Sequence, residues 1–216
     1  MSEPVSAAPR WRRRKTARPG EIAAAALEVF AEKGFAAARL EDVAARAGIS
    51  KAALYLYFDN KTDLFRAVVA QAVSPNLDRA RMLAAVEGEP LSRTVPTLLA
   101  LIAAVAQTTS IGGVAKMVIG ESRNFPDLAR VWHDQVISQA LAVITGMVER
   151  AQACGEARPG DPRLYAFSLM GPMVAGILWR EVFTPVGGAP LDLAALAEQH
   201  ARTVLQGLVL PQETPA

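Results

Sequence analysis

Few residues of this sequence have the types and spacing that catalysis requires. Ser110-Ile111-Gly112-Gly113 is not a nucleophile elbow, because the flanking glycines and the preceding strand are missing. No G-x-x-x-x-G-K-[ST] phosphate loop occurs. His133, His200 and Cys154 lack the spacing of metal ligands. The residues therefore favour a protein that is not an enzyme and that uses no metal and no cofactor.

A segment near the N-terminus instead has the residue types of a helix-turn-helix. Within residues 43–55, Ala44 is small enough for two helices to approach closely, and Gly48 can turn the chain with a positive φ. Apolar residues stand where the helices must bury a shared core: Val43, Ala47, Ile49 and Leu54. Such a pair presents the start of its second helix to base edges in the major groove of DNA.

Five linked motifs then resemble the TetR family of repressors in order and spacing. They are FAEKGF (30–35), DVA (42–44), GISK (48–51), LYLYF (54–58) and KTDLF (61–65). A weaker resemblance, to the branch related to efflux-pump regulators, covers ESRNFPDL (121–128) and the helices expected at 164–183 and 191–208. The resemblance implies an all-α fold of about nine helices. It would comprise an N-terminal three-helix helix-turn-helix domain that binds DNA and a C-terminal helical bundle for ligand binding and dimerisation.

The matched positions imply a DNA-binding surface around the second helix of the pair, made of Arg39, Ser50, Lys51, Ala52, Tyr55, Tyr57 and Lys61. Lys51 and Tyr55 would reach bases or phosphates, and Tyr57 and Lys61 would hold backbone phosphates. A core aromatic and a solvated charge are the alternatives for Tyr57 and Lys61. The family commonly has a hydroxyl residue where this chain has Arg39, and it has Gly and Thr or Ser in place of the two alanines after Lys51. We therefore expect DNA shape to supply a good share of the specificity.

Basic residues are concentrated in the first third of the chain. The net charge is +2, but residues 1–66 hold 12 Lys and Arg against 8 Asp and Glu, whereas residues 67–216 hold 11 against 13. Six basic residues without an acidic one lie between Pro4 and Gly20. We expect a mobile basic arm over residues 1–15 that contacts phosphates or the minor groove; a solubilising tail is the alternative.

The sequence predicts neither export nor a membrane span. Residues 1–9 lack the apolar segment of a signal peptide, and Glu28 interrupts the apolar run that follows Arg12-Arg13-Arg14. Thr94–Ala115 is uncharged, but it contains proline, glycine and several polar residues, so we expect a buried core helix. The single Cys154 excludes an intramolecular disulfide, which is typical of a reducing compartment. A cytoplasmic protein without membrane contact is predicted.

Apolar periodicity predicts helices throughout and no convincing strand. The expected helices cover residues 21–33, 40–47, 51–57, 61–87 (strained or broken at Pro75), 91–109, 113–124, 127–154, 161–183 and 191–208. The predicted organisation is an arm (1–15), a DNA-binding domain (16–76) with its helix-turn-helix at 39–58, a ligand-binding and dimerisation domain (77–210) and a tail (211–216).

A homodimer is predicted from the helix expected at 161–183, which is uncharged from Leu164 to Trp179. An apolar helix must be covered on nearly all its faces. The same helix of a second subunit, together with residues 191–208, would cover it and would place two recognition helices in major grooves roughly 34–36 Å apart. The candidate interface residues are Gly171, Val174, Leu178, Leu193 and Leu196.

The resemblance also places a ligand cavity among the C-terminal helices. The candidates to line it are large or adaptable apolar residues and one carboxylate: Met117, Glu121, Trp132, Phe167, Met170 and Met173. Methionine suits a site that accepts varied shapes. Ordinary core and surface roles are the alternatives for these residues. The implied effector is a small apolar molecule.

The function implied is that of a sequence-specific transcriptional regulator that binds double-stranded operator DNA. We expect a repressor that a small apolar ligand releases by stabilising a conformer whose two heads are wrongly separated, with the helix at 61–87 as the coupling element. An activator of the same fold is one alternative, and a dimer of this type that no longer binds DNA is another.

Overall fold

A computed structural model describes residues 19–86 and 88–210, so the predicted arm (1–15) and tail (211–216) lie outside the described residues. The described part is helical, and its only β-type pairing is an isolated antiparallel bridge between Ala157 and Val209. The α-helices are α1 (Pro19–Ala37), α2 (Leu40–Ala47), α3 (Lys51–Tyr55), α4 (Lys61–Ala84), α5 (Leu91–Thr108), α6 (Ile111–Glu121), α7 (Pro126–Trp132), α8 (Ser138–Ala153), α9 (Pro162–Val182) and α10 (Leu193–Leu208). A π-helix, η1 (His133–Ile137), joins α7 to α8, and a 3₁₀ turn, η2 (Thr184–Val186), follows α9.

The predicted all-α class is confirmed, and the helices follow the predicted pattern closely. Since α7, η1 and α8 are continuous, they form the single rod expected at 127–154. The α4 helix passes through Pro75 without a break, so it also crosses the predicted domain boundary at residue 76. The helix expected at 113–124 begins two residues earlier, at Ile111, because Gly112 and Gly113 are accommodated in the first turn of α6.

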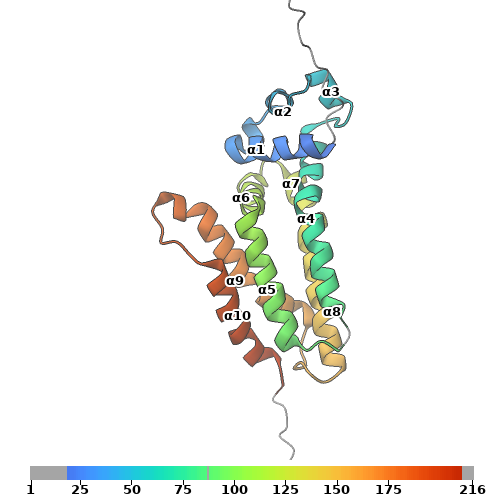
Figure 1. Ribbon diagram of the computed structural model, residues 1–216, viewed down its shortest axis with the longest axis vertical. Helices are drawn as coiled ribbons and strands as arrows, with labels where there is room; N and C mark the ends of the chain where they lie inside the picture. Colours follow the sequence, from blue (N-terminus) through green and yellow to red (C-terminus); the bar gives the residue numbers. More distant parts are fainter. Residues whose placement is uncertain (1–18, 87, 211–216) are drawn as a thin grey trace, which may run out of the picture.

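The helices form an elongated molecule with a small head at one end (Figure 1). The head consists of α1, α2 and α3, and α4 extends from it into the body beside α8. On the other side of the body, α5 packs against α10, which also packs against α9. The end of α9 and the loop after it project from the body (Figure 1).

The buried apolar side chains form two separate cores. The first, here called the head core, includes Phe30, Leu54 and Phe65 of the head and the start of α4, and it continues through Met117 of α6 and Leu128 of α7. The second, here called the body core, is built from α5, α8, α9 and α10 with the end of α4. Helices α6 and α7 therefore pack with the head, although they follow α5 in the sequence.

The α5 helix is long and apolar enough to cross a membrane, and no other helix in residues 19–86 and 88–210 is. Its side chains Leu91, Val95, Leu98 and Leu99 are buried in the body core. The helix therefore packs as the core helix that the sequence predicts for this region.

Candidate DNA-binding head and ligand cavity

The predicted helix-turn-helix is present as two short helices joined by a tight bend. Gly48 ends α2 with φ 68° and ψ 31°, a left-handed conformation that favours glycine. The Ile49 N–H donates to the Ala44 carbonyl at 3.0 Å across the bend. Ser50 caps α3, because its hydroxyl accepts the Ala53 N–H at 3.1 Å. Leu54 of α3 is fully buried beneath the two helices. The bend is therefore held by hydrogen bonds along its backbone and by the packing of Leu54.

The start and end of α3 form an exposed surface of small, aromatic and apolar groups. Ala52 is exposed, and Tyr55 and Tyr57 expose 44% and 37% of their surface. Leu56, between the two tyrosines, is 83% exposed, and sequence reasoning did not select it. The signal that could have found Leu56 is its place between two candidate DNA contacts at the end of a short helix. These four side chains make α3 suited to van der Waals contact with a groove.

Lys51 is held by a carboxylate that sequence reasoning also overlooked. Its ammonium forms an ion pair with Glu41 of α2 and lies 5.8 Å from the centre of the Tyr55 ring. The hydrogen bond and charge of Glu41 raise the pKa of Lys51, and Lys51 in turn lowers the pKa of Glu41. Lys51 is therefore held by an ion pair with Glu41 at the exposed start of α3.

Arg39 precedes α2 without supplying a side-chain cap. Its backbone N–H instead donates to the Asp42 carboxylate at 3.2 Å. The same carboxylate forms an ion pair with Lys33 at 2.9 Å. The hydrogen bond from Lys33 lowers the pKa of Asp42 most, and the hydrogen bond from the Arg39 amide lowers it further. The Arg39 residue is exposed immediately before the start of α2.

Lys61 is turned towards the interior. Its ammonium donates to the carbonyls of Phe35, Ala36 and Ala38 at 2.5, 3.2 and 2.9 Å. It also lies 4.5 Å from the centre of the Phe35 ring. Burial lowers the pKa of Lys61, and the charge of Glu121 opposes that shift. In this conformation the N–H donors are directed at residues 35–39, rather than at solvent. This segment runs from the kink at Gly34 in α1 to the start of α2 and is called here the link between α1 and α2.

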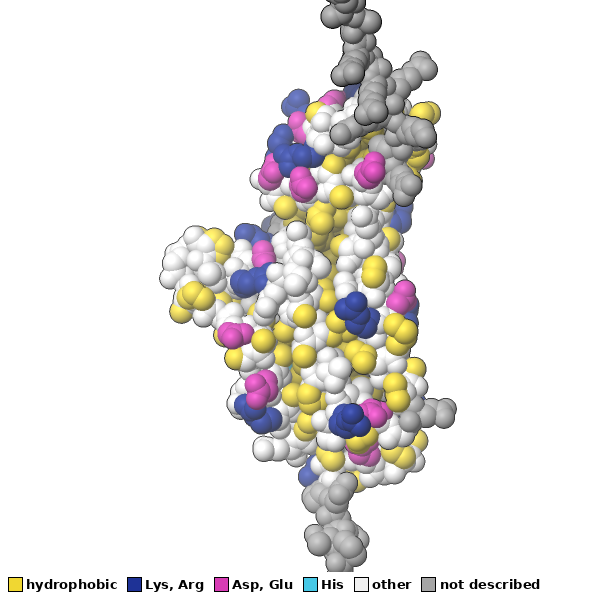
Figure 2. Space-filling model, in the orientation of Figure 1, with side chains coloured by type: hydrophobic (Ala, Val, Ile, Leu, Met, Phe, Trp, Pro, Cys, Tyr) yellow, Lys and Arg dark blue, Asp and Glu magenta, His cyan; other side chains and the backbone are white. Residues whose placement is uncertain are grey.

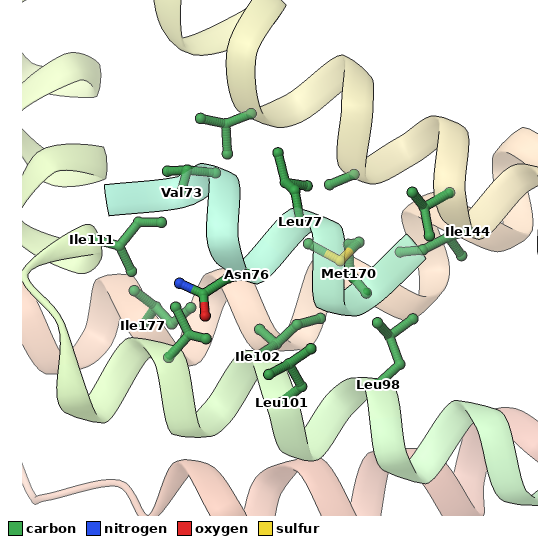
Figure 3. A pocket seen from close by; sticks show the side chains of 15 residues that line it. Val73, Asn76, Leu77, Leu98, Leu101, Ile102, Ile111, Ile144, Met170 and Ile177 are labelled. Carbon is green, nitrogen blue, oxygen red and sulfur yellow. The ribbon is translucent and has the colours of Figure 1, made fainter. Parts of the chain in front are cut away.

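The body contains an apolar cavity of about 130 Å³, shown in Figure 3. Side chains from α4, α5, α8 and α9 point into it, together with Ile111 at the start of α6 and Val136 of η1. Asn76 is the one polar residue among the fifteen that line it, and its amide nitrogen donates to the Ala72 carbonyl at 3.2 Å. With no charged group in its lining, the cavity suits an uncharged apolar guest.

Of the six candidate ligand residues, only Met170 lines this cavity. Met117 is buried in the head core and Trp132 packs against that core, whereas Met173 is fully buried in the body core. Their apolar character thus serves packing. Phe167 is 50% exposed, and its ring lies 5.8 Å from the guanidinium of Arg163.

Glu121 does not reach the cavity either. Its two carboxylate oxygens accept the backbone N–H groups of Phe35 and Ala36, at 2.8 and 2.7 Å. The carboxylate at the end of α6 is therefore joined to the link between α1 and α2 in the head.

Of the five candidate interface residues, two face outward, two face inward and one is partly buried. Gly171 and Val174 lie on the exposed face of α9, with no neighbour within 4 Å of the position that a Gly171 side chain would take. Leu178 is partly buried. Leu193 and Leu196 of α10 instead pack against Gly176 of the same chain, where a Cβ would meet their methyl groups at 3.0 and 2.6 Å.

Comparison with curated proteins gives relatives that regulate transcription. The chain is 25% identical over 204 residues to the HTH-type transcriptional repressor BepR of Brucella suis, a match that covers 90% of this chain and 93% of BepR. It is 40% identical over 82 residues to the HTH-type transcriptional activator FasR of Mycolicibacterium smegmatis, which covers 32% of this chain and 37% of FasR. The FasR match thus spans little more than a third of that protein.

Solved structures share the fold. A putative TetR-family regulator from Mesorhizobium loti superposes with a TM-score of 0.75 at 24% identity, over 92% of this chain and 100% of that one. FadR of Bacillus subtilis in complex with stearoyl-CoA superposes with a TM-score of 0.73 at 20% identity, over 88% of this chain and 99% of that one.

Family profiles cover both halves of the chain. Residues 22–68 match the family described as bacterial regulatory proteins, tetR family, and residues 86–193 match the tetracyclin repressor-like C-terminal domain. The first match contains the helix-turn-helix and the second contains most of the helices that surround the cavity. The chain belongs to the TetR family of bacterial transcriptional regulators.

Proposed function

We propose that this protein is a cytoplasmic homodimer that represses transcription from an operator and that a small, uncharged, apolar molecule releases it. The observation that carries the proposal is an uncharged cavity, apolar except for Asn76, in the body of a chain whose head is a helix-turn-helix. A binding space and a DNA-binding element on one chain are the two parts that a ligand-responsive regulator needs. No catalytic role is proposed.

The DNA contacts that we propose follow the exposure of the head. Ala52 and Tyr55 would face the bases, where the small alanine permits close approach and the ring can touch a thymine methyl group. Lys51, Tyr57 and Arg39 would hold phosphates on either side. Ser50 would contribute by fixing the start of α3. Because few polar groups reach the bases, sequence-dependent DNA shape would supply much of the discrimination.

The dimer that we propose uses the outward face of α9. Exposed residues recur there with helical spacing, at Leu164, Phe167, Gly171 and Val174. Apolar side chains also stand on the projecting end of α9 and on η2, which Figure 2 shows outside the body. A two-fold related copy of α9 would cover this stripe and would space the two heads for successive major grooves, roughly 34–36 Å apart.

The size and lining of the cavity define the class of effector. An engineered cavity of about 150 Å³ in another protein accommodates benzene, so the space of about 130 Å³ here takes one small ring or a short alkyl segment without movement. A larger guest must displace a wall or extend out of the cavity, because lining residues such as Leu101, Ile102 and Val143 are only partly buried. A single polar group on it could hydrogen-bond to Asn76, whereas a charge would be left unpaired in the lining.

A population shift would link the cavity to DNA. The ligand would stabilise the conformer in which the cavity is enlarged and the heads are misplaced, and it would weaken DNA binding by its preference for that conformer. Helix α4 is one route, because Val73, Asn76, Leu77 and Ala80 line the cavity while its first residue, Lys61, contacts the head.

Activation is the second candidate, supported by the similarity of part of the chain to the activator FasR. A reporter driven by the DNA upstream of this protein's own gene separates the two signs of regulation. For a repressor we expect expression to rise when the gene is deleted and to fall when it is restored. A fall on deletion would mean activation, and no change, together with no retarded band for any DNA, would mean a dimer that does not bind DNA.

Two variants test the site assignments. Arg39→Ala should reduce the slope of log Kd against log salt by about 1, because one phosphate contact is lost. Arg79→Ala, at an exposed position of α4 away from α3, is the matched control and should leave the slope unchanged. Equal slopes for the two variants would remove Arg39 from the interface.

A further inference from the structure

The cavity lies at the seam between the two cores. Val73, Leu77 and Val136 of its lining belong to the head core, whereas Leu98 and Ile144 belong to the body core. Figure 3 shows side chains from both sides directed into the same space. Close-packed cores move as units rather than deform locally. A guest that is wider than the cavity and lodges between these walls therefore pushes one core away from the other.

Helix α6 spans the distance from this seam to the head. Its first residue, Ile111, lines the cavity, and its last, Glu121, contacts the head. With 11 residues the helix is roughly 15 Å long at 1.5 Å per residue. At the middle of the helix Lys116 donates to the Glu181 carbonyl of α9 at 2.9 Å, so α6 also contacts a helix of the body core that borders the seam.

At its other end, α6 is fastened to the link between α1 and α2. Glu121 accepts the N–H groups of Phe35 and Ala36, while Lys61 donates to the carbonyls of the same two residues. The link is thus held through both of its hydrogen-bonding faces. Gly34 makes the approach possible, since a Cβ there would lie 2.7 Å from a Glu121 oxygen. The Phe35 ring also contacts Phe125, at 5.2 Å between ring centres.

We infer that Glu121 is the positioning residue through which occupation of the cavity sets the angle of the DNA-binding head. Hydrogen bonds from two backbone amides to a carboxylate are charge-assisted and directional, so displacement of α6 at Ile111 is carried to α1 and α2. The head, α6 and α7 then turn together against the body core. The inference rests on the proposed function and deepens it by naming the residue that connects its two sites.

The test compares the response to one apolar probe in four proteins. The probe is N-phenyl-1-naphthylamine, an uncharged aromatic amine with three rings that is larger than the cavity and fluoresces in apolar surroundings. Full-length wild type, Glu121→Ala, Glu121→Gln and the control Glu149→Ala, at an exposed glutamate of α8, are each titrated onto a duplex selected from random DNA by the wild type. The operator Kd is measured with and without saturating probe. The variant Ala140→Phe fills the cavity and shows whether the probe binds there.

For wild type and Glu149→Ala we expect the probe to raise the operator Kd by at least about fivefold, at the low end of usual allosteric coupling. For Glu121→Ala we expect less than twofold, with probe binding retained. Glu121→Gln, which keeps the shape and one acceptor oxygen, should fall between them. A fivefold or larger response in Glu121→Ala would overturn the inference and leave the proposed function standing. A probe that fills the wild-type cavity without altering its operator Kd would overturn both.

A second measurement tests the joint without any ligand. Amide hydrogen exchange of Phe35 and Ala36 should accelerate at least about tenfold in Glu121→Ala relative to wild type, while the amides of α10 exchange unchanged. The unchanged α10 amides show that the variant is folded. Equal protection of Phe35 and Ala36 in the two proteins would mean that Glu121 does not hold the link, and the inference would fail.

Discussion

Replacing Gly34 by alanine should destabilise the protein strongly, although the residue is only partly buried. Gly34 has φ 73° and ψ 167°, a backbone conformation that residues with a Cβ essentially do not adopt. Forcing alanine into it costs about 1–3 kcal/mol. The chain must turn here, because α1 ends its regular helical geometry at Gly34 before Phe35 enters the head core.

A steric term adds to this strain. The new methyl group would lie 2.7 Å from the Glu121 carboxylate, which is held by two amides and cannot move freely. A hydrogen bond to a charged group contributes about 1.5–3 kcal/mol; because Glu121 is partly exposed, we take about 1–2 kcal/mol for its displacement. The total is about 2–5 kcal/mol, a large fraction of the 5–15 kcal/mol by which proteins are usually stable.

Urea unfolding at one fixed protein concentration measures the cost. Gly120→Ala is the matched control, because Gly120 lies inside α6 with nothing within 4 Å of an added Cβ; it should gain up to about 1 kcal/mol from helix propensity. In a Glu121→Ala background the Gly34→Ala cost should fall by about 1–2 kcal/mol, because the clash is gone and only the strain remains. A cost below about 1 kcal/mol in wild type, or an equal cost in both backgrounds, would refute this reasoning.

Three further predictions concern other parts of the molecule. Gly176→Ala should destabilise the protein by about 1–3 kcal/mol in thermal or urea unfolding, because its Cβ meets leucine methyl groups. Gly171→Ala should instead weaken dimerisation, measured by sedimentation equilibrium. The reverse result would place the interface elsewhere. Lys61→Met should lose about 1–2 kcal/mol of stability yet keep the salt slope of operator binding, since its ammonium faces carbonyls; a slope reduced by about 1 would show a phosphate contact. The hydrogen bond from Arg46 lowers the pKa of Glu32, so the pair stabilises the fold above the usual glutamate value of 4.5 and that stability is lost as the pH falls through the depressed pKa. The difference in Tm between wild type and Glu32→Gln should therefore shrink from pH 6 to pH 2, and a constant difference would contradict the assignment.

Local patterns were sufficient to predict the helices and the helix-turn-helix. Gly48 and Ser50 act through their own backbone and nearest neighbours, so their residue types alone indicate a bend and a cap. The rod from α7 to α8 was also predictable, because its apolar period runs on through η1. The start of α6 was not, because the two glycines that usually end a helix are accommodated here in its first turn.

The roles of Lys61 and Glu121 could not be predicted, because each depends on contacts distant in sequence. Glu121 meets amides 85 and 86 residues away, and Lys61 meets carbonyls 23 to 26 residues away. A charged side chain has the same local pattern whether it faces solvent, a ligand or a backbone turn. Likewise, Met117, Met170 and Met173 are all apolar residues on helices, and only the arrangement of the two cores decides that Met170 lines the cavity.

The place of the cavity constrains how such a regulator can evolve. Several side chains that line the cavity, such as Val73, Leu98 and Ile144, also belong to one of the two cores. On the coupling proposed above, a substitution that enlarges the space for a new inducer would also change the resting angle of the head, and with it the basal level of expression. Inducer preference and basal expression should therefore change together. Adaptation to a new compound would require paired substitutions, one in the cavity lining and one that restores the resting angle of the head.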